Sequence, residues 1–272
     1  MSTRMLSLAA LTTLDVPPAE QVRIAAQIGY THVGLRLLPA TPSEPDYKLL
    51  GNTAAVRETR AALRETGIGV SDVEIVRLTP DFTLSDRLQQ FLETAGELGA
   101  SQVLVAGNDP QQARCGHNLA LLAEAGRQYG LTMNLEPMPW TDAPTIAAAR
   151  AIIAESGCEE VGILVDAIHF WRAGESLEAL RALPANTFNY MQLCDAPARA
   201  PDSVQGLIDQ ARVARLVPGE GGLDLHGLLR ALPAGLPVSI EVPLGGEQGR
   251  LPPSTRARLL YDAALAYLQP AP

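Results

Sequence analysis

Two patterns of hydrophobic residues alternate along the chain. Short runs rich in β-favouring apolar residues separate longer segments in which apolar residues return every three or four positions. The short runs predict eight strands, at residues 5–11, 32–37, 68–78, 102–106, 131–136, 161–166, 188–194 and 238–242. The longer segments predict helices that include residues 19–28, 53–66, 84–98, 113–129 and 145–156. A repeat of strand and helix of this kind is a βα unit, which builds a parallel sheet.

Glycines stand at the ends of several predicted helices, just before the next strand. Gly29, Gly67, Gly99, Gly130 and Gly157 hold this position, as expected of residues that adopt the left-handed conformation at a helix C-terminus. Eight βα units without a division into two halves, and without G-x-G-x-x-G after the first strand, favour a closed barrel over an open doubly wound sheet. We therefore predict an α/β fold, a single (β/α)8 TIM barrel that forms one domain over residues 1–272.

Composition narrows the class of protein. The 272 residues are 47% hydrophobic, which suffices for a large core, and no run is long enough to predict a membrane helix. The formal net charge of −9, without any basic run, makes nucleic acid an improbable partner. We read the first apolar run as a strand and not as a signal peptide. Three widely spaced cysteines, none in a C-x-x-C pair, suit a reducing cytoplasm.

Polar residues close four successive predicted strands. Glu136 ends the fifth strand before a proline, Asp166 ends the sixth, Gln192 lies near the end of the seventh, and Glu241 lies near the end of the eighth. In a parallel barrel these ends meet at one rim, where active sites form. Three converging carboxylates would repel one another unless a cation held them, and carboxylate and amide oxygens suit a hard ion. We predict one divalent metal ion, with Mn²⁺, Mg²⁺ or Co²⁺ favoured and Zn²⁺ still open.

The order and spacing of five segments carry a resemblance to a known family. These segments are residues 134–137 (NLEP), 165–169 (VDAIH), 192–195 (QLCD), 215–221 (RLVPGEG) and 239–242 (SIEV). Together they resemble the sugar phosphate isomerase/epimerase family, which has a xylose isomerase-like TIM barrel. The family also includes hydroxypyruvate isomerase-like and ketose 3-epimerase-like enzymes and is related to endonuclease IV. The resemblance covers nearly the whole chain and implies the same fold here.

The resemblance also implies roles for individual residues. Glu136, Asp166, Gln192 and Glu241 would bind the metal, and the two glutamates would be the catalytic acid/base pair. His169 and Arg215 would contact substrate oxygens. Gln192 departs from much of the family, in which histidine is frequent at this position, but an amide oxygen is a competent hard ligand. Four histidines in the whole chain are too few for the three zinc ions of endonuclease IV.

Other residues near the rim could bind substrate. Arg36 ends the second strand and Glu74 lies on the third; either could line the pocket, or the two could form a buried structural pair. The long interval before the eighth strand suggests a functional loop. Its Gly219, Gly221 and Gly222 resemble a phosphate cradle, although they also suit a tight turn before a helix capped by Asp224.

Three functions fit these residues. The first is a metal-dependent isomerase or epimerase of a small sugar or hydroxy-carbonyl compound, acting through proton abstraction and a metal-stabilised enediolate. The second is a lyase on the same barrel, similar to 3-dehydroshikimate dehydratases or to enzymes that cleave 3-oxo-glycosides. The third is a noncatalytic barrel that binds a small molecule. All three predict a small-molecule partner and leave a homo-oligomer open.

Overall fold

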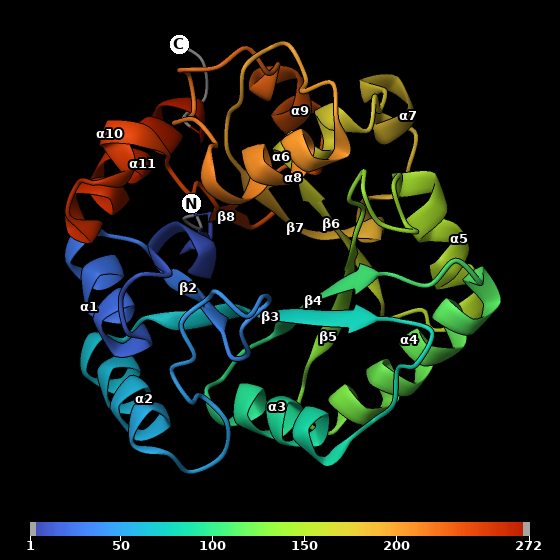
Figure 1. The fold of residues 1–272 in the computed structure, drawn as a ribbon, viewed down its shortest axis with the longest axis horizontal. Coiled ribbons are helices and arrows are strands. Elements are labelled where there is room, and N and C mark those ends of the chain that lie inside the picture. Colours follow the sequence, from blue (N-terminus) through green and yellow to red (C-terminus); the bar gives the residue numbers. More distant parts are fainter. Residues whose placement is uncertain (1–3, 269–272) are drawn as a thin grey trace.

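The computed structural model describes residues 4–268, and within them eight parallel strands close into a barrel surrounded by helices (Figure 1). The strands pair in chain order, and β8 closes the barrel against β1. They are β1 (Leu6–Leu8), β2 (His32–Arg36), β3 (Gly69–Leu78), β4 (Gln102–Gly107), β5 (Thr132–Glu136), β6 (Gly162–Asp166), β7 (Phe188–Leu193) and β8 (Val238–Ile240). The predicted TIM barrel is confirmed, with all eight strands in the predicted places.

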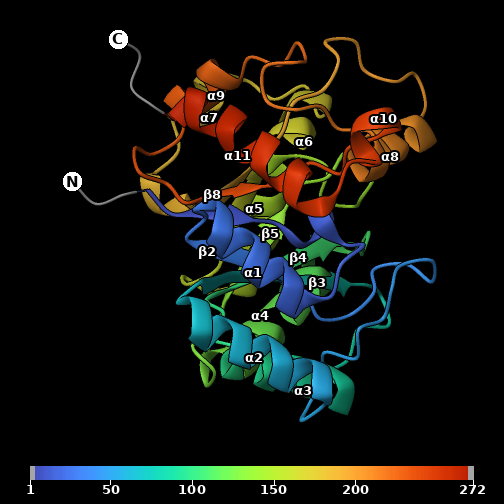
Figure 2. The ribbon, with the colours of Figure 1, turned by 90° about the vertical axis from the view of Figure 1, so that its left-hand side faces the viewer.

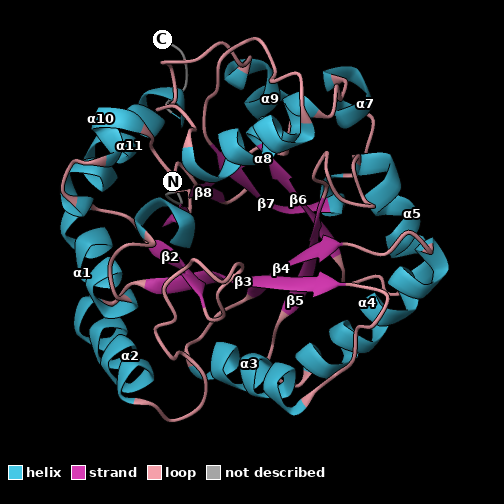
Figure 3. Ribbon diagram, in the orientation of Figure 1, coloured by secondary structure: helices cyan, strands magenta, loops and turns pink. Residues whose placement is uncertain are grey.

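Helices fill the intervals between the strands and form the outer ring (Figure 3). They are α1 (Pro18–Ile28), α2 (Ala54–Thr66), α3 (Asp86–Glu97), α4 (Gln112–Arg127), α5 (Ile146–Ser156), α6 (Ala167–Arg172), α7 (Leu177–Arg181), α8 (Val204–Val213), α9 (Leu225–Ala231), α10 (Gly246–Gly249) and α11 (Pro253–Leu268), together with the short 3-10 helices η1 (Ala10–Thr13) and η2 (Ala185–Thr187). The first predicted strand is therefore too long, because its second half turns into η1. None of the helices described is long and apolar enough to cross a membrane.

The helix ends follow the sequence signals. Thr53 and Thr145 begin α2 and α5 by accepting a hydrogen bond from a backbone N–H in the first turn. Gly29, Gly67 and Gly157 end α1, α2 and α5 with positive φ angles, a conformation that costs glycine little. These signals are local, which explains why the helix boundaries could be predicted closely.

Apolar side chains fill the space between the strands and the helices, whereas the inside of the barrel is partly polar. A large core joins both layers, and a small separate cluster of Leu104, Leu164 and Tyr190 fills the middle of the barrel with Ile75 packed on it. Buried polar residues lie on the same strands, toward their carboxyl ends. In the side view of Figure 2, α8 and α10 lie together, and the loop before α2 reaches the same end of the barrel. This end carries the pocket.

Candidate active site

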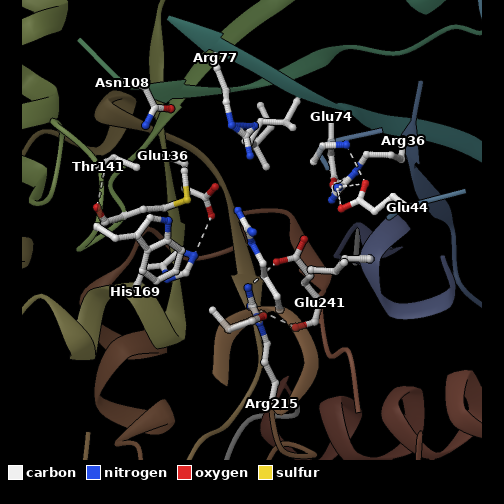
Figure 4. Close-up of a pocket in the computed structure, with 18 residues that line it drawn as sticks. Arg36, Glu44, Glu74, Arg77, Asn108, Glu136, Thr141, His169, Arg215 and Glu241 are labelled. Carbon is white, nitrogen blue, oxygen red and sulfur yellow. Dashed lines mark hydrogen bonds and ion pairs between the residues drawn. The ribbon is translucent and has the colours of Figure 1, made fainter. Parts of the chain in front are cut away.

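A pocket of about 130 Å³ opens at the carboxyl ends of the strands, a size that suits a small ligand. Six predicted site residues line it, and Figure 4 shows them around the opening. They are Arg36, Glu74, Glu136, His169, Arg215 and Glu241. Asp166 and Gln192 lie beneath the lining, with exposed fractions of 1% and 0%. We call Glu136, Asp166, Gln192 and Glu241 the floor of the pocket.

One arginine joins two carboxylates of the floor. The Arg215 guanidinium donates to Asp166 Oδ2 at 2.5 Å and lies 2.7 Å from Glu241 Oε2, with all three side chains buried. Its Nε donates to the carbonyl of Ala211 at 2.7 Å, which fixes the direction of the guanidinium. Burial alone would lower the pKa of Arg215, but the carboxylates, with Asp166 first, hold it well above the usual value. Arg215 is therefore a permanent positive charge in the floor.

Asp166 also organises the backbone after β6. Its Oδ1 accepts hydrogen bonds from the N–H groups of Ile168 at 2.8 Å and His169 at 3.3 Å, so Asp166 is the N-cap of α6. Burial acts to raise the pKa of Asp166, but the Arg215 charge outweighs it and lowers that pKa below the usual value. This cap directs His169 back toward the floor.

His169 lies beside Glu136 and is uncharged. Its Nε2 is 3.7 Å from Glu136 Oε1, and its ring packs edgewise on Trp140 with ring centres 4.8 Å apart. Burial lowers the pKa of His169 to about 4, so the ring is neutral at neutral pH. A neutral imidazole can donate a hydrogen bond or ligate a metal, which keeps both roles available.

The two glutamates predicted as the acid/base pair stand on either side of the pocket (Figure 4). Burial first, and then Asp166 and Glu241, raise the pKa of Glu136 well above its usual value. Burial also raises the pKa of Glu241 to about 8, although Arg215 opposes this shift. In both groups the raised pKa favours the protonated form, and a nearby cation would oppose this shift.

The donor atoms of the floor fit a divalent cation. Ligand atoms of Glu136, Asp166 and His169 lie within 4.8 Å of one another. Gln192 donates through Nε2 to Glu241 Oε1 at 3.0 Å, while its buried Oε1 has no hydrogen-bond partner among the described residues. A buried acceptor without a partner is costly, and a hard cation would satisfy it. The group of three includes two of the four predicted ligands and His169; Glu241 lies outside it, so the predicted ligand set stays a prediction.

Arg36 and Glu74 are held by each other. Arg36 lies 2.6 Å from Glu74 Oε2 and 2.9 Å from Glu44 Oε2, and its side chain is 9% exposed. These contacts form a buried pair that also lines the pocket, which combines the two interpretations left open by the sequence. Because two carboxylates already neutralise Arg36, its charge is not free for a substrate anion.

The glycine-rich segment surrounds a carboxylate of the protein itself. The N–H groups of Gly219 and Gly221 donate to Asp195 Oδ2 at 3.0 and 3.1 Å, and that of Leu223 donates to Oδ1 at 3.2 Å. Asp224 then caps α9, as predicted. Asp195 thus takes the donors that the phosphate interpretation required, so this loop serves as a turn in the structure described.

Four residues near the opening were not singled out from the sequence: Arg77, Asn108, Trp140 and Arg212. Arg77 stands near the carboxyl end of β3, so the same strand-end rule could have found it. Arg212 lies on α8, and no local signal distinguishes it from an ordinary exposed helix residue. They come from β3, from the loops after β4 and β5, and from α8.

Comparison with known proteins agrees with this architecture. A model of the xylose isomerase-like TIM barrel matches residues 22–269. The chain belongs to this family. Among solved structures, the barrel is similar to the IolI protein with a bound zinc atom, with a TM-score of 0.78, 17% identity, and 98% of each chain covered. It is also similar to 3-keto-D-glucoside 4-epimerase from E. coli, with a TM-score of 0.70, 19% identity, and coverage of 97% of this chain and 99% of that one.

A curated relative of this xylose isomerase-like barrel is more similar in sequence. The 3-dehydroshikimate dehydratase of Pseudomonas putida is 27% identical over 212 residues, which cover 71% of this chain and 32% of the relative. The chain thus spans about a third of the length of that relative. The proteins to which the chain is similar include an epimerase and a dehydratase, so the similarity does not choose between these two reaction types.

Proposed function

We propose that the chain is a divalent-metal-dependent enzyme that removes a proton from a carbon next to a carbonyl group in a small hydroxylated substrate. The observation that carries this proposal is the floor, where three buried carboxylates and an amide oxygen that has no partner among residues 4–268 lie at a small pocket beside the neutral His169. A cation bound there would draw electron density from the substrate carbonyl and acidify the neighbouring C–H bond.

The residues of the chain supply the proton transfers. A glutamate freed of its own proton by the nearby cation is the base, and Glu136 and Glu241 stand on opposite sides of the pocket for this role. Arg215 keeps Asp166 and Glu241 in place through short ion pairs, and neutral His169 can donate a hydrogen bond to a substrate oxygen.

Similarity to 3-dehydroshikimate dehydratase at the level of sequence favours elimination as the outcome. One glutamate takes the proton, the C–H electron pair forms a double bond, and the C–O bond at the β carbon breaks. The leaving hydroxide takes a proton from the second carboxyl group and departs as water. Glu136 and Glu241 both line the pocket, so one can take the proton from carbon while the other serves the leaving group.

Epimerisation is the second candidate, because epimerases share this barrel and two glutamates face the pocket from opposite sides. In this outcome the second glutamate returns a proton to the same carbon from the other face. The two candidates therefore share the abstraction step and differ in the fate of the intermediate carbanion.

The test uses protein loaded with Mg²⁺ or Mn²⁺ and incubated in heavy water with 3-dehydroshikimate or with D-fructose. Elimination gives a conjugated product that absorbs in the ultraviolet, and epimerisation gives deuterium at the epimerised carbon. Glu136→Gln and Glu241→Gln should each lower turnover by about 100-fold or more, because an amide is not a base near neutral pH. Exposed Glu247→Gln is the matched control and should retain activity. Equal turnover by the wild type and both pocket variants would contradict the proposal.

A further inference from the structure

Two arginines at the opening of the pocket have no partner in the part of the chain that the structure describes, in contrast to Arg36 and Arg215. Arg77 and Arg212 line the pocket and are partly exposed. Across residues 4–268, neither side chain forms an ion pair or a hydrogen bond, whereas Arg36 and Arg215 each contact two carboxylates. Figure 4 shows Arg77 extending from β3 into the pocket without a dashed contact.

The two guanidinium groups come from different elements but line the same pocket. Arg77 stands near the carboxyl end of β3, and Arg212 stands on the last turn of α8. Burial lowers the pKa of Arg77, and Arg212 and then Arg36 lower it further through like-charge repulsion. Holding two positive charges close together in a half-buried pocket costs free energy, and a bound anion would recover it.

The positive charges of Arg77 and Arg212 contrast with the negative net charge of the whole protein. At a formal net charge of −9, the molecule as a whole repels anions. An uncharged sugar would satisfy the hydrogen-bonding groups of the two arginines but would leave both charges uncompensated. A carboxylate or a phosphate group matches the planar fork of a guanidinium and also neutralises it.

We propose that Arg77 and Arg212 bind an anionic group of the substrate, a carboxylate or a phosphate, while the hydroxy-carbonyl part of the same molecule lies at the floor. This inference rests on the proposed function and narrows its substrate class to anionic compounds. It also assigns specificity to two residues on the side of the pocket away from the floor, where they touch the substrate without taking part in proton transfer.

The experiment compares matched ligands by calorimetry. The first pair is 3-dehydroshikimate and its methyl ester, which differ in one negative charge, and the second pair is D-fructose 6-phosphate and D-fructose. The wild type should bind at least one anion about tenfold or more tightly than its neutral partner. Arg77→Gln and Arg212→Gln should each reduce that preference by about tenfold, the size of one charge-assisted contact. Exposed Arg150→Gln on α5 removes the same charge and should leave the preference unchanged.

The two pairs identify the anion, since a preference in the first indicates a carboxylate and in the second a phosphate. Equal affinities within both pairs, no binding of either anion, or a preference that survives the double variant Arg77→Gln/Arg212→Gln would overturn the inference. Repeating the titrations after chelation of metal separates the two proposals. An anion preference with no effect of metal would contradict only the proposed function, and metal-dependent binding without an anion preference would contradict only this inference.

Discussion

Two buried acidic regions lie side by side at the carboxyl end of the barrel and satisfy their charges differently. Around Asp195, four backbone N–H groups point at one carboxylate, those of Ala196, Gly219, Gly221 and Leu223. In the floor of the pocket, two of the three carboxylates share a single guanidinium, the third lies 3.7 Å from the His169 ring, and a buried amide oxygen has no partner among the described residues. The first region completes its own hydrogen bonds; the second leaves acceptors that a ligand would complete.

The hydrogen-bond donors around a carboxylate distinguish a structural role from a ligand-binding role. A carboxylate that serves the fold accepts hydrogen bonds from the chain around it, and its removal should lower stability. A carboxylate that serves a ligand, such as Glu136, is held by few donors, and its removal should lower affinity. Asp166 accepts hydrogen bonds from the chain and also lies in the floor, so its removal should lower both. Each of the following predictions tests one side of this distinction.

The largest effect is expected at Asp166. Asp166→Ala should weaken metal binding by about 100-fold or more, because a charged ligand of the floor is lost. The variant also removes the α6 cap and one partner of buried Arg215, so some loss of stability is expected as well. Metal analysis and circular dichroism of purified protein measure the two effects separately. Stoichiometric metal in Asp166→Ala would remove this residue from the ligand set.

Asp195→Ala should show the reverse behaviour. Four N–H groups lose a charged acceptor in a buried loop, so the free energy of unfolding should fall by about 2–4 kcal/mol. Urea unfolding of the metal-free protein measures this change. Metal affinity should stay within about threefold of the wild type, since the carboxylate faces the loop. A loss of metal binding at unchanged stability would reverse the roles assigned to the two regions.

The barrel could be predicted from the sequence because its signals are local. Strand periodicity, helix caps and the step from strand to loop are local signals, and parallel closure then brings the strand ends together. Closure brings the ends of β5 to β8 to one rim, where Glu136 and Asp166 lie near each other and Gln192 contacts Glu241; their role as metal ligands stays a prediction.

The pairing of charges could not be predicted in this way. Glu44 lies in the loop before α2, and its contact with Arg36 depends on how that loop folds over the opening. For the glycine-rich loop, a phosphate cradle stayed open beside a tight turn because nothing in the sequence of the loop shows that its N–H groups bind Asp195. Whether an arginine is paired, as Arg215 is, or free, as Arg77 is, depends on contacts between distant segments.

Another buried carboxylate, that of Asp72 on β3, gives a prediction of pH dependence. A bulge on β3 leaves Ser71 unpaired beside Asp72, whose Oδ1 accepts a hydrogen bond from the Ser71 hydroxyl while Oδ2 has no partner among the described residues. Burial first, and then Glu74, raise the pKa of Asp72 to about 7. Its charged form is therefore disfavoured in the folded state.

The sign follows from the raised pKa. Below pH 4 Asp72 is protonated in both states and costs nothing; from pH 4 to 7 only the unfolded chain releases the proton, so stability falls as pH rises. Asp72→Asn removes this loss, and its advantage over the wild type should grow to at most about 4 kcal/mol at pH 7 and then level off. Unfolding by urea at several pH values measures the difference. A difference that does not change with pH would show that Asp72 ionises normally.

The smallest effect is expected at Gln192, the floor residue that offers an amide oxygen in place of a carboxylate. Gln192→His replaces a hard amide oxygen by an imidazole nitrogen, and the ring N–H can still donate toward Glu241. Imidazole suits Zn²⁺ better than Mg²⁺, so the ratio of zinc affinity to magnesium affinity should rise by about tenfold, or about 1.4 kcal/mol. Gln205→His on the exposed side of α8 adds a histidine away from the floor and controls for zinc binding at the surface. If both variants change the ratio equally, the Gln192 side chain does not contact the ion, and the acceptor without a partner in the floor belongs to the fold and not to the ligand.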